Sequence, residues 1–169
     1  MFAPVIREYM RRSDAPEDVG CQVAVKDRLH AIKNPHAHLH LPDIDIDTVK
    51  NSPMLWEPTR FLESCPSSDG ACAMVLAAES HADTSIHKPA WVHAMAMRSE
   101  PSFYPWREEV NPEASRACAK DLYSQAGITQ PRKQLDMAEV YVPFSWFEPI
   151  WLKSLGFAEP GQGWRLTLE

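Results

Sequence analysis

The chain has 169 residues, of which 44% are hydrophobic and 24% are charged, a composition typical of a globular domain with a buried core. Its formal net charge of −6 gives no electrostatic basis for binding nucleic acid or an anionic membrane surface. The 4 cysteines include no Cys-x-x-Cys pair, and no apolar run reaches the length of a membrane span. We therefore expect a cytoplasmic protein with reduced thiols that binds neither nucleic acid nor a membrane.

Four segments carry the apolar spacing of one helix face. They cover residues 2–12, 14–34, 111–127 and 145–156. The third has the clearest ends, because Pro112 stands at the first helical position after Asn111 and Gly127 follows the last apolar position. In the fourth, Ser145 and Glu148 have the spacing of a capping box. The pattern predicts helices over all four segments.

Three apolar segments have the pattern of β-strands: residues 71–78, 90–97 and 135–142. The first is a continuous apolar run, typical of a strand buried on both faces. The second alternates large and small side chains, so its small face would let a helix approach closely. The order β, β, α, β, α predicts an α/β fold with at least one parallel crossover. Three strands make a thin, incomplete mixed sheet, whose edges require another chain or segment.

The chain is expected to divide at about residue 68. Residues 35–68 contain 5 prolines and show little periodicity, which predicts a long loop-rich segment of a kind that often covers a functional site. We expect residues 1–68 to form helices and a cover-loop region. Residues 69–169 are expected to form the layered α/β part.

Four stretches are similar to one protein family in the same order along the chain. They are residues 23–37, residues 68–77, residues 126–128 with 136–144, and residues 152–157 with 161–163. Together they resemble the thiolase superfamily, specifically its sterol-carrier and lipid-transfer-protein type. The resemblance implies a partial thiolase-like layered fold taken from the centre of the family's chain. The half that carries the nucleophilic cysteine and the C-terminal Gly-His-Pro region have no counterpart here, and no cysteine of this chain takes the nucleophile's place.

The resemblance implies an acyl-CoA enzyme that forms or cleaves carbon–carbon bonds in lipid or steroid side-chain metabolism, by Claisen, retro-Claisen or retro-aldol chemistry. Coenzyme A would enter as part of the thioester substrate, with no separate cofactor. Without the nucleophile, the isolated chain is expected to be inactive. The alternative is a non-catalytic half-subunit that pairs with a complementary thiolase-like chain. The implied partners are a second thiolase-like chain in a homo- or heterodimer and a small companion with an OB-fold and a zinc ribbon.

Tyr141 is the candidate catalytic residue. It ends the predicted strand 135–142, and ligands of open α/β sheets bind at the carboxyl ends of strands. By the resemblance, this position carries asparagine, histidine or, in aldolase-like members, tyrosine; a phenol there would donate a hydrogen bond to a thioester or alkoxide oxygen, or transfer a proton. The family's next two polar residues are replaced by Val142 and Pro143. The alternative is a half-buried tyrosine whose hydroxyl is satisfied by the fold.

The second predicted helix carries a group of basic residues. They are Lys26, Arg28, His30 and Lys33. This cluster is the candidate site for the phosphates of coenzyme A, because cations on one helix can hold phosphate against a negative mean charge. The alternative is an ordinary solvated helix face.

His36, His38 and His40 suggest a metal site, since alternate residues of an extended segment lie on one face and three imidazoles can bind zinc or copper. Only Asp43 offers an acidic ligand nearby in the sequence. The alternative, a solvated polar loop near the coenzyme A entrance, fits the proline-rich context better. We therefore expect no metal centre, and a histidine-based metal protein is the third functional hypothesis.

Overall fold

The computed structural model describes residues 2–84, 86–101 and 107–169, without the side chains of residues 83 and 84. The helices are α1 (Phe2–Ser13), α2 (Val19–Ala31), α3 (Ile46–Lys50), α4 (Glu113–Ala126), α5 (Pro131–Gln134), α6 (Phe147–Ser154) and α7 (Gly163–Thr167). Two short 3₁₀ helices are η1 (Phe61–Glu63) and η2 (Glu79–Thr84), and the strands are β1 (Met54–Trp56) and β2 (Thr59–Arg60). The strands pair antiparallel in a two-stranded sheet.

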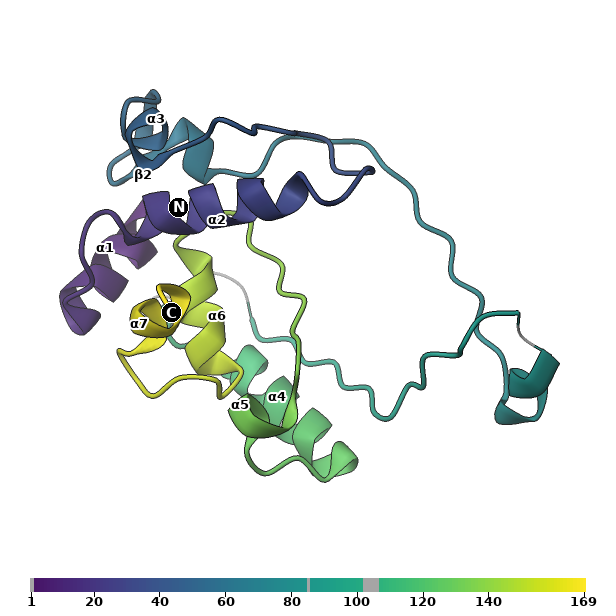
Figure 1. The fold of residues 1–169 in the computed structure, drawn as a ribbon. Coiled ribbons are helices and arrows are strands. Elements are labelled where there is room, and N and C mark those ends of the chain that lie inside the picture. The colour runs from purple at the N-terminus through teal and green to yellow at the C-terminus, as the bar shows by residue number, and fades with distance from the viewer. Residues whose placement is uncertain (1, 85, 102–106) are drawn as a thin grey trace.

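The main core forms where α6 meets α1, α2 and α7 (Figure 1). Its buried members are Ile6, Tyr9, Ala15, Val19, Trp146, Phe147 and Ile150. The Tyr9 hydroxyl accepts a hydrogen bond of 3.2 Å from the backbone N–H of Trp164, which fastens α7 to α1. Two ends of the chain that are distant in sequence therefore share one apolar core.

A smaller core joins α2 to the proline-rich segment, and this segment is more ordered than the predicted loop. Cys21 and Ala24 of α2 pack with Ile44 and with Val49 of α3, all buried. Short segments with few apolar residues can still form helical turns when one side chain of each enters a shared core. The expectation of a mainly loop-rich segment over residues 35–68 thus omitted α3, β1, β2 and η1.

The close packing of α2 depends on a glycine. A Cβ atom on Gly20 would lie 2.1 Å from Oε1 of Glu63 and 2.2 Å from Nε1 of Trp146. Both of these side chains are buried. Any other residue at position 20 would push α2 away from η1 and from the start of α6. These elements can therefore pack closely only because position 20 has no side chain.

All four predicted helices form, with differences at their ends. α4 ends as the sequence indicates, with Gly127 in the left-handed conformation at φ 69°. The predicted capping box of α6 does not form, because the Ser145 hydroxyl lies 3.4 Å from Oε1 of Glu63 and Glu148 pairs with Lys26. The side chains of Ser145 and Glu148 therefore contact residues distant in sequence instead of capping the helix.

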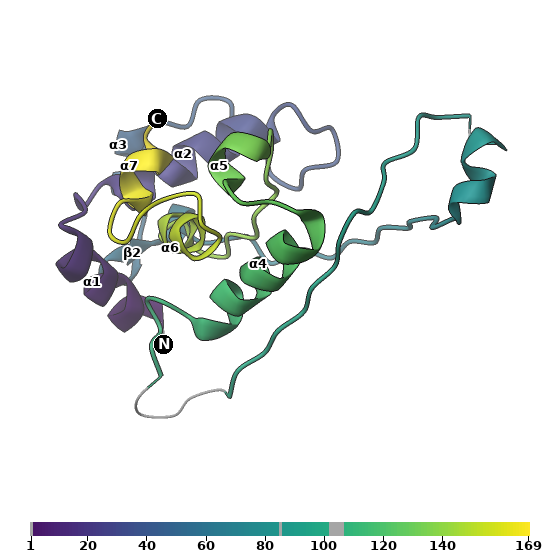
Figure 2. The same cartoon turned by 90° about the horizontal axis from the view of Figure 1, so that it is seen from below.

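The three predicted strands are unpaired in the described part of the chain. Residues 71–78, 90–97 and 135–142 run as extended coil, and the excursion containing the first two projects from the helical body in both views (Figures 1 and 2). A strand is stabilised by a ladder of backbone hydrogen bonds and by cross-strand side-chain contacts. No neighbouring backbone in the described residues supplies that ladder, so the strand prediction was wrong for the chain as it stands.

One of these segments does have the predicted covering helix. Sγ of Cys118 in α4 lies 3.3 Å from the carbonyl oxygen of Ala96, and Arg98 forms an ion pair with Asp121. Ala94 and Ala96 of the small face are half-buried, whereas Ala90 and Val92 of the same face are exposed, as is Met97 on the large face. Helix α4 therefore lies beside the end of this segment, around Ala96.

Replacing Gly20 with alanine should lower the free energy of unfolding by about 1–3 kcal/mol, because the new methyl group overlaps Glu63 and Trp146. Alanine in a helix is otherwise favoured over glycine, so the sign of the change is informative. Gly70→Ala is the matched control, since its Cβ would meet no atom within 4 Å. Urea unfolding of both variants measures the difference, and equal stabilities would contradict the close approach.

Candidate functional site

Tyr141 lies on the extended segment that joins α5 to α6. Its side chain is 78% exposed and lines an open pocket of about 310 Å³ beside Ser115 of α4 and Trp151 of α6. Leu155 and Glu139 complete most of the lining. The phenol thus stands at a concave surface with an apolar wall, a hydroxyl and a carboxylate, as expected for a group that contacts a partly apolar ligand.

The segment after Tyr141 is anchored by backbone pairing. The N–H of Cys65 donates to the carbonyl of Pro143 over 2.9 Å, and the N–H of Ser145 donates to the carbonyl of Glu63 over 2.9 Å. These bonds flank an antiparallel bridge between Ser64 and Phe144. The backbone pairing around Pro143 therefore fixes the position of the segment from which Tyr141 projects.

Glu63 is the polar centre of this anchor, and no local sequence pattern indicated its role. Its Oε2 accepts a 2.7 Å hydrogen bond from the N–H of Arg60, and its Oε1 lies 3.4 Å from the Ser145 hydroxyl. Burial raises the pKa of the Glu63 carboxyl above its ordinary value, while the contacts from Arg60, Trp146 and Ser145 oppose that rise. A buried carboxylate here links η1 to the start of α6.

The basic cluster of α2 and the turn after it does not converge on one pocket. Lys26 forms an ion pair with the buried Glu148, and Arg28 donates a 3.0 Å hydrogen bond to the carbonyl of Ser64. His30 and Lys33 are exposed. Two of the four predicted phosphate ligands are thus engaged in holding the fold, and the other two remain accessible.

The histidine segment shows other contacts in place of a metal site. A ring nitrogen of His38 bonds to the Ser68 hydroxyl, and Nε2 of His40 lies 2.9 Å from the carbonyl oxygen of Asn34. Among the residues that the structure describes, no group of three or more His, Cys, Asp and Glu side chains is placed to hold a metal ion. These contacts favour the polar-loop alternative.

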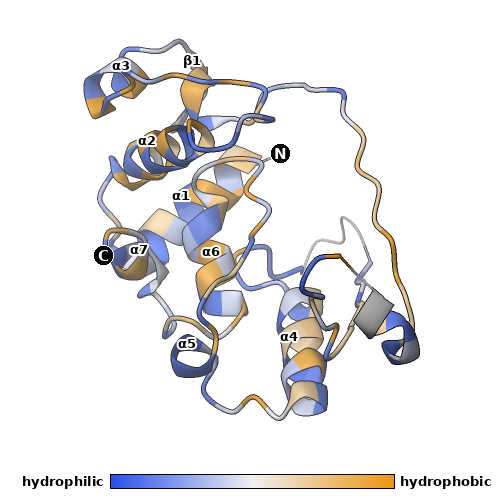
Figure 3. Ribbon diagram, turned by 45° about the vertical axis from the view of Figure 1, so that its right-hand side comes forward, coloured by the Kyte–Doolittle hydropathy of each residue, from blue (hydrophilic) through white to orange (hydrophobic). Residues whose placement is uncertain are grey.

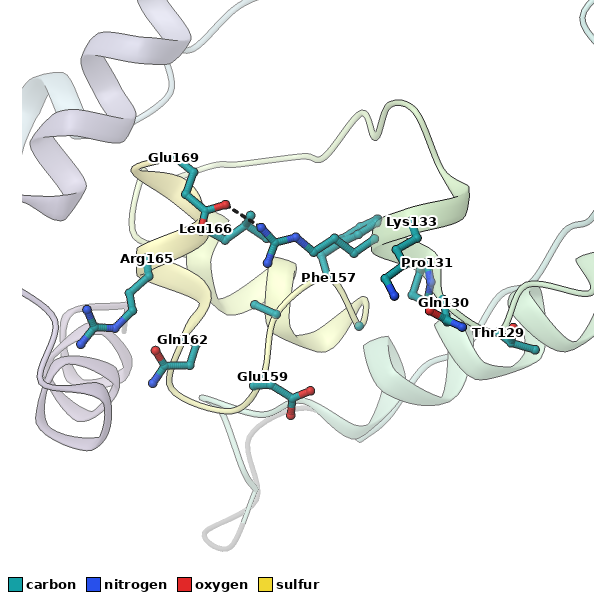
Figure 4. Close-up of a pocket in the computed structure, with 13 residues that line it drawn as sticks. Thr129, Gln130, Pro131, Lys133, Phe157, Glu159, Gln162, Arg165, Leu166 and Glu169 are labelled. Atoms are coloured by element: carbon teal, nitrogen blue, oxygen red, sulfur yellow. Dashed lines mark hydrogen bonds and ion pairs between the residues drawn. The ribbon is translucent and has the colours of Figure 1, made fainter.

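A larger pocket of about 540 Å³, which the sequence did not indicate, lies between α5, the turn after α6, and α7 (Figure 4). Arg132 on α5 forms an ion pair with Glu169 across it, and the charged side chains of Lys133, Arg165 and Glu159 also line it. No local pattern could reveal this pocket, because its walls come from segments more than 20 residues apart in the sequence. Its mixed charges indicate no single ligand class.

Comparison with curated proteins gives relatives in one superfamily. The 17-hydroxy-3-oxo-4-pregnene-20-carboxyl-CoA lyase of Mycobacterium tuberculosis is 32% identical over 95% of this chain and 42% of its own length. A steroid side-chain-cleaving aldolase of Thermomonospora curvata is 31% identical over 96% of this chain and 41% of its own length. Sterol carrier protein 2 of Bos taurus is 26% identical over 99% of this chain and 31% of its own. No family model matches the chain.

Comparison with solved structures gives a relative of the same kind. A chain described as an Ltp2-ChsH2(DUF35) aldolase is superimposed with a TM-score of 0.89 and 28% identity over 98% of this chain. In sequence and in fold the chain is similar to the sterol-carrier type of the thiolase superfamily. The predicted α/β class with a partial thiolase-like fold is confirmed, although the strands of that fold are unpaired here. The chain spans less than half the length of these relatives and 44% of the solved chain. Among the described residues, no helix is long and apolar enough to cross a bilayer.

Lys26→Ala should lower the free energy of unfolding by about 1–3 kcal/mol, because it leaves the buried carboxylate of Glu148 without its cation. Lys33→Ala, on the exposed end of the same basic cluster, should change stability by less than about 0.5 kcal/mol. Thermal or urea unfolding separates the two variants. Equal effects would contradict the structural role of Lys26.

The pH dependence of stability should report the burial of Glu63. Because its folded-state pKa is raised, its contribution is complete below the ordinary glutamate range and declines as pH rises through the raised value. The stability of the wild type relative to Glu63→Gln should therefore fall as the pH rises above the ordinary glutamate range. Urea unfolding over a series of pH values measures the difference, and parallel pH profiles would show that Glu63 titrates normally.

Proposed function

We propose that this chain is the central part of a thiolase-like enzyme that cleaves or forms a carbon–carbon bond next to an acyl-CoA thioester in lipid or steroid side-chain metabolism. The observation that carries the proposal is the position of Tyr141, on the rim of a concave surface within a fold shared with a carboxyl-CoA lyase and a side-chain-cleaving aldolase. Retro-aldol cleavage is the reaction that these relatives' names favour.

In a retro-aldol cleavage, a base removes the proton of the β-hydroxyl group, and the electron pair of the carbon–carbon bond moves into the thioester enolate. A carbonyl product leaves, and the enolate carbon takes up a proton. Tyr141 would donate a hydrogen bond to the oxygen that becomes negative, or relay one of these protons. Trp151 and Leu155 would provide an apolar wall for the acyl part of the substrate.

The other parts of the site would come from elsewhere. His30 and Lys33 are the members of the α2 cluster still accessible to a phosphate of coenzyme A. The remaining catalytic groups would belong to the thiolase-like portion that this chain does not span, in a dimer or with a companion protein. A solved relative described by two protein names supports such an association.

A second candidate is a non-catalytic half-subunit, which completes a thiolase-like partner without contacting the reacting atoms. The exposure of Tyr141 favours it, because among the described residues its hydroxyl has no hydrogen-bond partner that would orient it. In that case the chain would be required for assembly, while the phenol would be dispensable.

Tyr141→Phe should reduce turnover about 100-fold or more in the assembled enzyme, because a transition-state hydrogen bond or proton relay is lost. The assay is release of the steroid ketone from 17-hydroxy-3-oxo-4-pregnene-20-carboxyl-CoA, the compound in the name of the Mycobacterium tuberculosis relative. Stability should be unchanged, since the hydroxyl is exposed.

Tyr123→Phe is the crossed control for this variant. The Tyr123 hydroxyl donates a 2.7 Å hydrogen bond to the carbonyl of Leu155, so its loss should lower stability by about 1 kcal/mol and leave turnover near the wild-type value. If Tyr141→Phe retains full turnover while deletion of the chain abolishes turnover, the chain is a non-catalytic half-subunit and Tyr141 has no catalytic role.

A further inference from the structure

We propose that Lys153 is the nucleophilic amine of a second site, which binds a small 2-oxo carboxylic acid and captures it as an imine. Lys153 lies in the last turn of α6 and lines a pocket of about 250 Å³ between α1, α6 and the turn before α7. This pocket shares no lining residue with the pocket of Tyr141. The inference therefore goes beyond the proposed function and does not rest on it.

The pocket lies where α1 meets α6, two helices that Figure 3 shows next to each other with hydrophobic and hydrophilic residues on both. Its apolar walls come from Val110, Ile150 and Pro160. Its polar side chains are those of Tyr9, Arg12, Ser13, Asn111 and Lys153. The volume is below the roughly 300 Å³ at which pockets for drug-sized ligands begin, so the pocket suits a smaller molecule.

The amine of Lys153 is free to react. It forms no hydrogen bond or ion pair with the residues that the structure describes, whereas Lys26 on α2 is paired with Glu148. Burial lowers the pKa of Lys153, the positive charge of Arg116 lowers it further, and the negative charge of Glu108 opposes this shift. A lysine that is partly removed from water and near other cations holds more neutral amine, which is the form that attacks a carbonyl carbon.

The charge of the pocket favours an oxo acid over a neutral ketone. Among the described residues that line it, Arg12 and Lys153 are cationic and none is acidic. Arg12 donates from Nε to Glu8 over 2.6 Å and from Nη1 to Glu108 over 2.7 Å, which leaves Nη2 without a partner in the described part of the chain. A carboxylate bound in the pocket would accept from this nitrogen, and hydrogen bonds between ionised groups are the strong ones.

Two further groups suit the formation of an imine. The Tyr9 hydroxyl accepts a hydrogen bond from the backbone N–H of Trp164, so its own proton remains for donation. Burial raises the pKa of Tyr9 to about 12, which keeps this proton on the phenol at neutral pH. Oδ1 of Asn111 is buried and has no hydrogen-bond donor among the described residues, so the polar contacts in the pocket wall are incomplete. The phenol would donate to the ketone oxygen as the amine attacks.

The reaction balances without a further reagent. Nζ of Lys153 attacks the ketone carbon, the C–N bond forms, and the electron pair of the C=O bond moves to oxygen. A proton passes from nitrogen to this oxygen, which gives a carbinolamine. Its hydroxyl group then takes up a proton and leaves as water, and the nitrogen gives up its last proton as the C=N bond forms. One amine and one ketone thus give one imine and one water, with no oxidation or reduction.

Reductive trapping tests the site on the full chain. The chain is incubated at neutral pH with pyruvate and sodium cyanoborohydride, which reduces the imine to a stable secondary amine. Peptide mass spectrometry then measures the rate of modification at each lysine. Lys153 should be modified more than about tenfold faster than Lys120, an exposed lysine of α4. The ratio of these two rates should fall as the pH approaches about 10, where ordinary lysines also lose their proton.

Acetone is the matched probe, because it presents a ketone without the carboxylate. The ratio of the Lys153 rate to the Lys120 rate should be several-fold greater with pyruvate than with acetone, and Arg12→Gln should remove that difference. Lys153→Arg should abolish the fast modification and leave the rate at Lys120 unchanged. A Lys153 rate with pyruvate no higher than the Lys120 rate would overturn the site, and equal ratios for the two ketones would overturn its assignment to an oxo acid. Both of these comparisons use the wild-type chain, so they hold even if a variant fails to fold.

Discussion

The close approach of α2 to Glu63 and Trp146 is the contact on which the described fold depends. It is possible only because Gly20 has no side chain, since a Cβ there would overlap both groups. Trp146 fills the core between α1 and α6, and Glu63 satisfies the N–H of Arg60 at the start of η1. The absence of a side chain at Gly20 thus lets α2 approach both the apolar ring of Trp146 and the polar side chain of Glu63. The polar part is favourable only while its hydrogen bonds are complete.

This contact also connects α2 and η1 to the candidate site. Glu63 and Cys65 pair through their backbones with the residues on both sides of Phe144, and Tyr141 stands three residues before that bridge. Lys26 strengthens the same junction through Glu148. Tyr141 therefore lies on an exposed segment whose neighbouring residues are fixed by backbone hydrogen bonds. A side chain with a chemical role requires such a fixed position.

The helices were predictable because their signals are local. Apolar residues at helical spacing and a glycine at the end of α4 need no information from the rest of the chain. The junction was not predictable, since Ser145 and Glu63 are 82 residues apart and their contact displaced the capping box that the local sequence suggested. The strand prediction failed for another physical reason. Residues 71–78 have the composition of a buried strand, but a strand forms only when a second segment pairs with it, and none of the described residues pairs with this one. For the site, the sequence indicated the phenol but not the pocket walls at Ser115 and Trp151.

The thiolase-like chain combines an ordered helical body with extended segments that no described residue pairs with in a sheet. Amide hydrogen exchange on the isolated chain tests this most directly. The N–H groups of Cys65 and Ser145, which donate to backbone carbonyls across the junction, should exchange slowly, while residues 72–77 should exchange at the rate of an unfolded peptide. Slow exchange throughout residues 72–77, or exchange at Cys65 and Ser145 as fast as in an unfolded chain, would contradict it.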